Sequence, residues 1–137
     1  MELLTVELHY FTIHVLNVWR TCEWYRQVFG LTTNVSPDGT FAHFSAAGRV
    51  LAFAAHELYE TALGPRQLNS FLSGPSAFHV DITTADVSAL FAHAIAHGAV
   101  AVRPPETSPA GQCVATVRDL NGLLIRLLEN EPCVASA

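Results

Sequence analysis

Tyrosine, histidine, aspartate and threonine side chains recur at every second residue in two short segments that each read as a β-strand. The segments place these side chains at Tyr10, Thr12 and His14, and at His79, Asp81 and Thr83. Because side chains alternate between the two faces of a strand, each set of three shares one face. Histidine changes charge near neutral pH and can act as a general base, and Asp81 could orient His79 or stabilise its charge. These two faces are therefore the first candidates for a binding or catalytic site.

The two segments begin the two halves of an internal repeat. Residues 10–18 and 79–87 both read as a short strand followed by a helix start, with Asn17 and Asp86 at matching positions. Either side chain can accept hydrogen bonds from the first unpaired N–H groups of a helix. Apolar residues then recur every three or four positions, and Gly30 and Gly98 stand where a left-handed helix cap favours glycine. The repeat therefore predicts one amphipathic helix in each half.

Further strands are expected after each helix. In the first half, a turn at residues 37–39 separates strand patterns, and another strand pattern covers residues 50–54. In the second half, residues 104–111 read as a proline-rich loop. Asn121-Gly122 then predicts a type I′ hairpin that leads into a strand at residues 123–128. Each half thus has the pattern βαβββ.

The sequence predicts an α+β fold in which a single domain, residues 1–137, holds two βαβββ modules in tandem. Module one covers about residues 5–56, a linker about 57–76, and module two about 77–131. Two such sheets placed edge to edge would enclose a cup, forming a pair of half-barrels. A ferredoxin-like domain is the structural alternative, but its halves have a different strand count.

The composition limits the partners that the protein can have. Half of the 137 residues are hydrophobic, and the formal net charge is −5, which disfavours nucleic acid because phosphate binding needs a basic surface. No apolar stretch approaches the roughly 20 residues that cross a bilayer, and the first residues do not resemble a signal peptide. The three cysteines have no CxxC spacing, so they are expected to be reduced. We therefore expect a cytoplasmic protein that binds neither nucleic acid nor membranes.

Two segments carry a resemblance to a known family. Residues 24–31, WYRQVFGL, resemble the "FYxxVLGL" pattern, and residues 118–127, RDLNGLLIRL, resemble the "RDPDGNxIEL" pattern. Both patterns are typical of the vicinal oxygen chelate superfamily, which includes glyoxalases, bleomycin resistance proteins and dioxygenases. The resemblance implies paired βαβββ modules, a cup that holds a small molecule, and a homodimer in which the modules pair within one chain or across two.

Metal-dependent members of this superfamily carry ligands at four inward positions, on the first and last strand of each module. The resemblance places these positions at Tyr10, Ala52, His79 and Arg126. Only His79 is a usual ligand, because alanine has no donor atom and the arginine guanidinium has no lone pair to give. A phenol is also a poor anionic ligand at neutral pH. We therefore expect no metal and no cofactor, which disfavours the metal-dependent reactions of the family.

The predicted ligand site is mixed in character. It combines polar groups of the first strands with small or apolar groups of the last strands, and its members are Tyr10, Thr12, His14, His43, Ala52, His79, Asp81, Thr83 and Arg126. The first hypothesis is a protein that binds or sequesters a hydrophobic or aromatic organic ligand, such as a drug or antibiotic, without the family metal.

Two other functions remain open. The protein could be an enzyme of the lyase, isomerase, cyclase or dioxygenase type, either metal-dependent or metal-free with His79 or His14 as the base. It could also be an interaction module without a ligand. The alternative for Asp81 and Arg126 is a purely structural role, in which they form an internal salt bridge because buried charges must be paired. The residues also leave open which way His43, His56 and Trp19 face, while His93 and His97 read as solvated helix residues.

Overall fold

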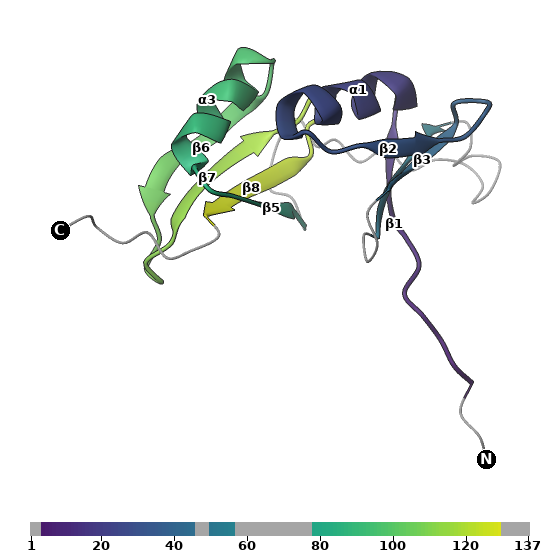
Figure 1. The fold of residues 1–137 in the computed structure, drawn as a ribbon, viewed down its shortest axis with the longest axis horizontal. Helices are drawn as coiled ribbons and strands as arrows, with labels where there is room; N and C mark the ends of the chain where they lie inside the picture. Colours follow the sequence, from purple (N-terminus) through teal and green to yellow (C-terminus); the bar gives the residue numbers. More distant parts are fainter. Residues whose placement is uncertain (1–3, 46–49, 57–77, 130–137) are drawn as a thin grey trace. The chain divides into compact units, whose positions relative to one another are not determined.

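The computed structural model describes residues 4–45, 50–56 and 78–129 of the chain (Figure 1). The chain divides into two compact units, one within residues 1–67 and the other within residues 68–137. Each unit is described by itself below. The predicted linker at residues 57–76 lies outside the described residues.

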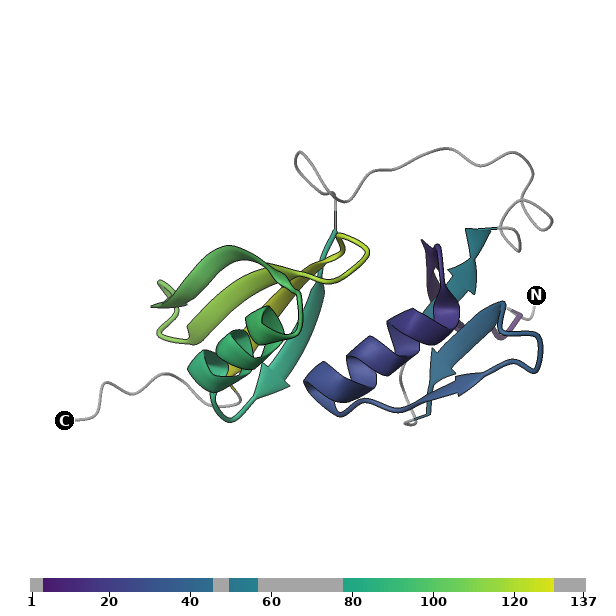
Figure 2. The ribbon, with the colours of Figure 1, turned by 90° about the horizontal axis from the view of Figure 1, so that it is seen from above.

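The first unit contains a helix and a four-stranded sheet. Its elements are β1 (Phe11–Val15), α1 (Val18–Phe29), β2 (Thr33–Val35), β3 (Phe41–Phe44) and β4 (Leu51–Ala55). The strand order is β1-β4-β3-β2, with β1 parallel to β4 and the other pairs antiparallel. Helix α1 lies across one face of this sheet and contacts β2, β3 and β4 (Figure 2).

The second unit repeats this arrangement. Its elements are β5 (Val80–Thr84), α3 (Val87–Ala96), β6 (Val100–Thr107), β7 (Cys113–Arg118) and β8 (Leu124–Glu129). The strand order is β5-β8-β7-β6, again with the first and last strands parallel. The equivalent order in both units confirms the predicted α+β fold of two tandem βαβββ modules. The cup between the sheets stays a prediction.

Both helices begin where the sequence predicts, and α1 ends at the predicted glycine, whereas the C-cap of α3 is His97, one residue before Gly98. The Asn17 side chain accepts a hydrogen bond of 3.0 Å from the backbone N–H of Arg20, and Asp86 accepts one of 3.0 Å from Ala89. Such a cap contributes about 1 kcal/mol to a helix because it satisfies an N–H group that lacks a partner within the helix. After α1, Gly30 adopts a φ of 68°, in the left-handed region that glycine enters without a steric penalty.

The core of each unit lies between its helix and its sheet. In the first unit, Tyr25 of α1 is fully buried, and its ring centroid lies 5.1 Å from that of Phe53 in β4. In the second unit, Val87 of α3 and Ile125 and Leu127 of β8 are fully buried. Apolar residues at helical spacing therefore cover apolar residues at strand spacing in both units.

Three local predictions are wrong. Pro104 and Pro105 lie within β6 rather than in a loop, because β6 is an edge strand with two register irregularities, and such strands tolerate a missing N–H. The hairpin at Asn121-Gly122 forms, but no residue other than glycine has positive φ in the described part of the chain, so the turn is not type I′. Instead the buried Asp119 carboxylate accepts hydrogen bonds from the N–H groups of Asn121 and Leu123, at 2.8 and 2.9 Å.

The third wrong prediction concerns the cysteines. Cys113, at the start of β7, is disulfide-bonded, whereas the lack of a spacing motif predicted a reduced thiol. The pairing depends on tertiary structure, which spacing along the chain does not report. Cys22 of α1 is free and buried. Among the described residues, no helix has the length and apolar character needed to cross a membrane.

Candidate functional site

Each sheet has a second face, opposite to its helix, which we call the distal face. In the first sheet, Thr12 pairs with Ala52, and Ala52 pairs with His43, so these three residues share the distal face. In the second sheet, Asp81 pairs with Arg126 in the same way. Strand alternation therefore groups these residues on common faces as predicted, and it places His43, whose direction the sequence left open, on the distal face.

A polar network lies on the distal face of the second sheet. The guanidinium of Arg126 donates two hydrogen bonds to Asp81, from Nε to Oδ1 at 2.9 Å and from Nη2 to Oδ2 at 3.1 Å. His79 Nε2 lies 2.9 Å from the same Oδ1. The three side chains are between 43% and 46% exposed, so the network is accessible to a ligand. The predicted salt bridge between Asp81 and Arg126 is therefore present, and it includes His79.

The network stabilises the charges of Asp81 and Arg126. Hydrogen bonds from Arg126 hold the pKa of Asp81 below its ordinary value, against the opposing effect of partial burial, and the charges of Arg126 and His79 lower it further. The hydrogen bond to Asp81 correspondingly raises the pKa of Arg126. Asp81 is thus a carboxylate at neutral pH, and it orients a guanidinium that still has N–H groups not directed at Asp81.

An aromatic cluster lies on the first sheet. The ring centroid of Tyr10 lies 5.3 Å from that of Phe41 and 5.6 Å from that of His43. The Nδ1 atom of His43 lies 3.2 Å from the carbonyl oxygen of Phe44 and must donate to it, so Nε2 carries the lone pair when the ring is neutral. Rings in this arrangement offer a flat apolar surface with a polar edge.

His14 occupies the same distal face, opposite Ala54 in β4. Burial lowers the pKa of His14 because it disfavours the charged imidazolium, and the nearby His56 lowers it further by repulsion. His14 is therefore mostly neutral at pH 7, as a general base needs to be.

The remaining predicted site residues differ in accessibility. Thr12 is half-buried, Thr83 is exposed, and Ala52 is fully buried with 0% of its surface accessible. The structure thus brings His79, Asp81 and Arg126 together in the second unit, and Tyr10 and His43 together in the first.

The residues at the family's four metal positions do not fit a metal ion. Ala52 has no donor atom, and the Arg126 guanidinium has no lone pair and donates its hydrogen bonds to Asp81. Across residues 4–45, 50–56 and 78–129, no group of three or more His, Cys, Asp or Glu side chains is arranged to hold an ion. A hard or borderline cation needs several such donors.

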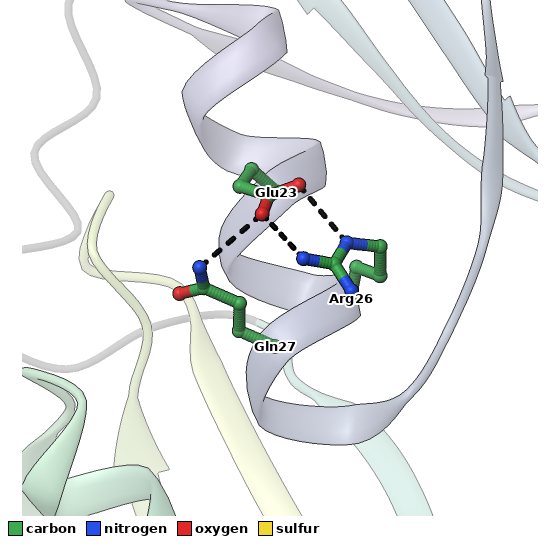
Figure 3. A network of polar contacts seen from close by, with 3 residues as sticks. All are labelled: Glu23, Arg26 and Gln27. Carbon is green, nitrogen blue, oxygen red and sulfur yellow. Dashed lines mark hydrogen bonds and ion pairs between the residues drawn. The ribbon is translucent and has the colours of Figure 1, made fainter.

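One feature that the sequence did not indicate is a pocket of about 390 Å³ between α1 and β2. Its lining residues are Trp19, Cys22, Glu23, Arg26, Thr32, Thr33 and Val35. On its helix side, Glu23 forms an ion pair with Arg26 and accepts a hydrogen bond of 3.2 Å from Gln27 (Figure 3). Burial raises the pKa of the Cys22 thiol, so Cys22 is a poor nucleophile at neutral pH. Trp19 lines this pocket and lies beside the turn at Gly39.

Comparisons with known proteins identify the family. The sequence profile of the Glyoxalase/Bleomycin resistance protein/Dioxygenase superfamily matches residues 7–127. No curated protein sequence matches the chain.

Several solved structures share the fold. A hypothetical protein from S. aureus, SA1046, superposes with a TM-score of 0.76 at 17% identity, covering 91% of this chain and 95% of the other. A superfamily enzyme from Burkholderia phytofirmans PsJN superposes with a TM-score of 0.73 at 23% identity, covering 90% of this chain and 98% of the other. A glyoxalase-related enzyme from Fulvimarina pelagi superposes with a TM-score of 0.74 at 19% identity, covering 90% of this chain and 88% of the other. The chain therefore belongs to the Glyoxalase/Bleomycin resistance protein/Dioxygenase superfamily.

Proposed function

We propose that this protein binds a small aromatic or hydrophobic organic ligand that carries a polar or anionic group, such as a drug or antibiotic, without a metal ion. The observation that carries the proposal is the network of His79, Asp81 and Arg126. It combines a permanent cation with hydrogen-bond donors, and the family resemblance assigns two of its members, His79 and Arg126, to metal-ligand positions. Small-molecule sites commonly combine a few such polar groups with apolar surface.

Arg126 is the proposed anchor for the polar end of the ligand. Asp81 occupies Nε and Nη2 of the guanidinium, and the remaining N–H groups can donate to a carboxylate, sulfonate or phenolate. Because Asp81 holds one edge of the guanidinium through two hydrogen bonds, Arg126 needs little further ordering when the ligand binds. A charge-assisted hydrogen bond of this kind favours an anionic or strongly polar group.

The aromatic cluster of Tyr10, Phe41 and His43 is a second and independent candidate contact surface. Its ring centroids are 5.3–6.4 Å apart, which suits contact with an aromatic ligand body. The proposal assigns the anchor to the second sheet alone, so variants in each unit test the two surfaces separately.

The test uses two fluorescent probes that differ in charge. 8-Anilinonaphthalene-1-sulfonate is an aromatic anion, and N-phenyl-1-naphthylamine is its neutral analogue. We expect Arg126→Met to weaken sulfonate binding by about tenfold or more, because a charge-assisted hydrogen bond is lost, and to leave the neutral probe nearly unaffected. Tyr10→Ala should weaken the binding of both probes.

Arg103→Met is the matched control. Arg103 lies on the same sheet and is paired with Glu106, so this variant removes the same charge away from the network. An equal loss in Arg103→Met and Arg126→Met would mean that only net charge matters, and the assignment of the anchor would fail.

Metal independence has its own test. Elemental analysis follows incubation of the untagged protein with zinc, manganese and iron(II), and is repeated on His79→Gln. A stoichiometric ion that is lost in His79→Gln would show that the family metal binds, and would contradict the proposal.

The second candidate is a metal-free enzyme with His79 as general base. The favouring observation is the 2.9 Å contact from His79 Nε2 to Asp81, which would orient the imidazole so that Nδ1 faces a substrate proton. Turnover of an enolisable aromatic substrate that falls at least about a hundredfold in His79→Gln would favour this reading. Equal turnover in His79→Gln and the unmodified protein would exclude it.

A further inference from the structure

Two histidines lie one turn apart at the carboxyl end of α3. His93 and His97 are both exposed, and their ring centroids are 4.3 Å apart. The Nδ1 atom of His97 lies 2.9 Å from the carbonyl oxygen of His93. A carbonyl can only accept, so Nδ1 carries the proton and Nε2 carries the lone pair in the neutral ring. Metal-binding histidines are commonly oriented by this type of hydrogen bond.

We propose that His93 and His97 chelate one divalent transition-metal ion, of the class Cu²⁺, Ni²⁺ or Zn²⁺. Two imidazoles that bind one ion through nitrogens at 2.0–2.1 Å have ring centroids roughly 4.5–5 Å apart. The observed centroid distance of 4.3 Å is close to this range. Residues four apart along a helix lie on the same face, so both rings stand on one side of the end of α3.

The position on the helix also favours a cation. The carboxyl end of a helix carries a partial negative charge from its last carbonyl groups, and His97 is the C-cap residue of α3. No acidic side chain completes a group of three donors here within the part of the chain that the structure describes. Water would fill the remaining positions, so the site is an open and exchangeable one, with Cu²⁺ bound most tightly.

This site is separate from the proposed ligand site. Helix α3 contacts β6, β7 and β8 on the face of the second sheet opposite to Asp81 and Arg126. The two proposals can therefore fail independently, because probe binding depends on Arg126 and metal binding on α3.

The experiment titrates the untagged full-length protein with Cu²⁺ and with Ni²⁺ by calorimetry. We expect His93→Gln and His97→Gln each to lower the affinity for one equivalent of metal ion by about tenfold or more, since each variant removes one of the two chelating imidazoles. Glutamine keeps a comparable helix propensity to that of histidine. His9→Gln is the control, because His9 is an exposed histidine outside α3, and it should leave this equivalent unchanged.

A spectroscopic measurement identifies the ligands. The electron paramagnetic resonance spectrum of one equivalent of Cu²⁺ should show coupling to two imidazole nitrogens, and to one in either α3 variant. Equal affinities of the unmodified protein and both α3 variants would overturn the proposal. A loss in His9→Gln as large as that in the α3 variants would overturn it as well.

Discussion

The ion pair between Asp81 and Arg126 should make a measurable and pH-dependent contribution to the stability of the second unit. Asp81→Asn removes the charge and keeps the shape of the side chain. Two hydrogen bonds of 2.9 and 3.1 Å form a bidentate pair, which is stronger than a single contact. Both side chains are more than 40% exposed, however, and solvent screens such pairs to about 1 kcal/mol at most. We expect Asp81→Asn to lower the free energy of unfolding by about 0.5–1 kcal/mol at pH 7.

The pH dependence follows from the direction of the pKa shift. The pKa of Asp81 is lower in the folded protein than in the unfolded chain, because Arg126 stabilises the carboxylate. The stabilisation is therefore fully present above the unfolded pKa of about 3.9 and is lost as the pH falls through the folded pKa. The difference between the unmodified protein and Asp81→Asn should shrink as the pH is lowered from 5 towards 2.5.

The assay is urea unfolding followed by far-ultraviolet circular dichroism, which reports on both units. Tryptophan fluorescence would not serve, because Trp19 and Trp24 both lie in the first unit. A double-mutant cycle with Arg126→Met isolates the pair from other effects of each substitution. A coupling energy that is zero at pH 7, or that stays constant down to pH 2.5, would refute the reasoning.

Three other predictions concern the first unit. Asn17→Ala should destabilise it by about 1 kcal/mol through loss of the helix cap, as measured by urea unfolding with tryptophan fluorescence; no change would mean that the 3.0 Å hydrogen bond contributes nothing. Gly39→Ala should lower the free energy of unfolding by about 1–2 kcal/mol, because Gly39 has a φ of 72° and a Cβ there would overlap Nε1 of Trp19. An unshifted tryptophan emission together with unchanged stability would contradict that contact. Finally, nuclear magnetic resonance titration should find the pKa of His14 below the ordinary histidine value, and His56→Gln should raise it by removing the repulsion; an unshifted titration of His14 would contradict the burial argument.

The fold could be predicted from the sequence because its signals are local and occur twice. Asn17 and Asp86 mark two helix starts at matching positions, and each helix is followed by turn residues at comparable intervals. Strand β6 escaped prediction because Pro104 and Pro105 argue against a central strand, and only the topology shows that this strand is at an edge. The type of the turn at Asn121 was not predicted because the Asp119 carboxylate, rather than the backbone alone, determines the shape of the turn.

The candidate site was predictable in part for a related reason. Strand alternation is a property of the sequence, so it identifies which residues share a face. It does not report strand register, and register is what places Asp81 beside Arg126 and Thr12 beside Ala52. The pocket between α1 and β2 depends on how a helix packs on a sheet, so spacing along the chain gave no sign of it.

The strand register also shows which side chains differ between the distal faces of the two units. Thr12 with Ala52 in the first sheet and Asp81 with Arg126 in the second occupy equivalent paired positions on β1 and β4 and on β5 and β8. The backbone arrangement is the same, so the difference between the two distal faces comes from side chains alone. A charged pair that holds its guanidinium in place suits an anionic group, whereas Thr12 and Ala52 beside aromatic rings form a smaller and uncharged surface that suits a less polar group. If the protein binds an amphipathic ligand, discrimination by charge must therefore follow substitutions in the second sheet, and discrimination by ring size must follow substitutions in the first.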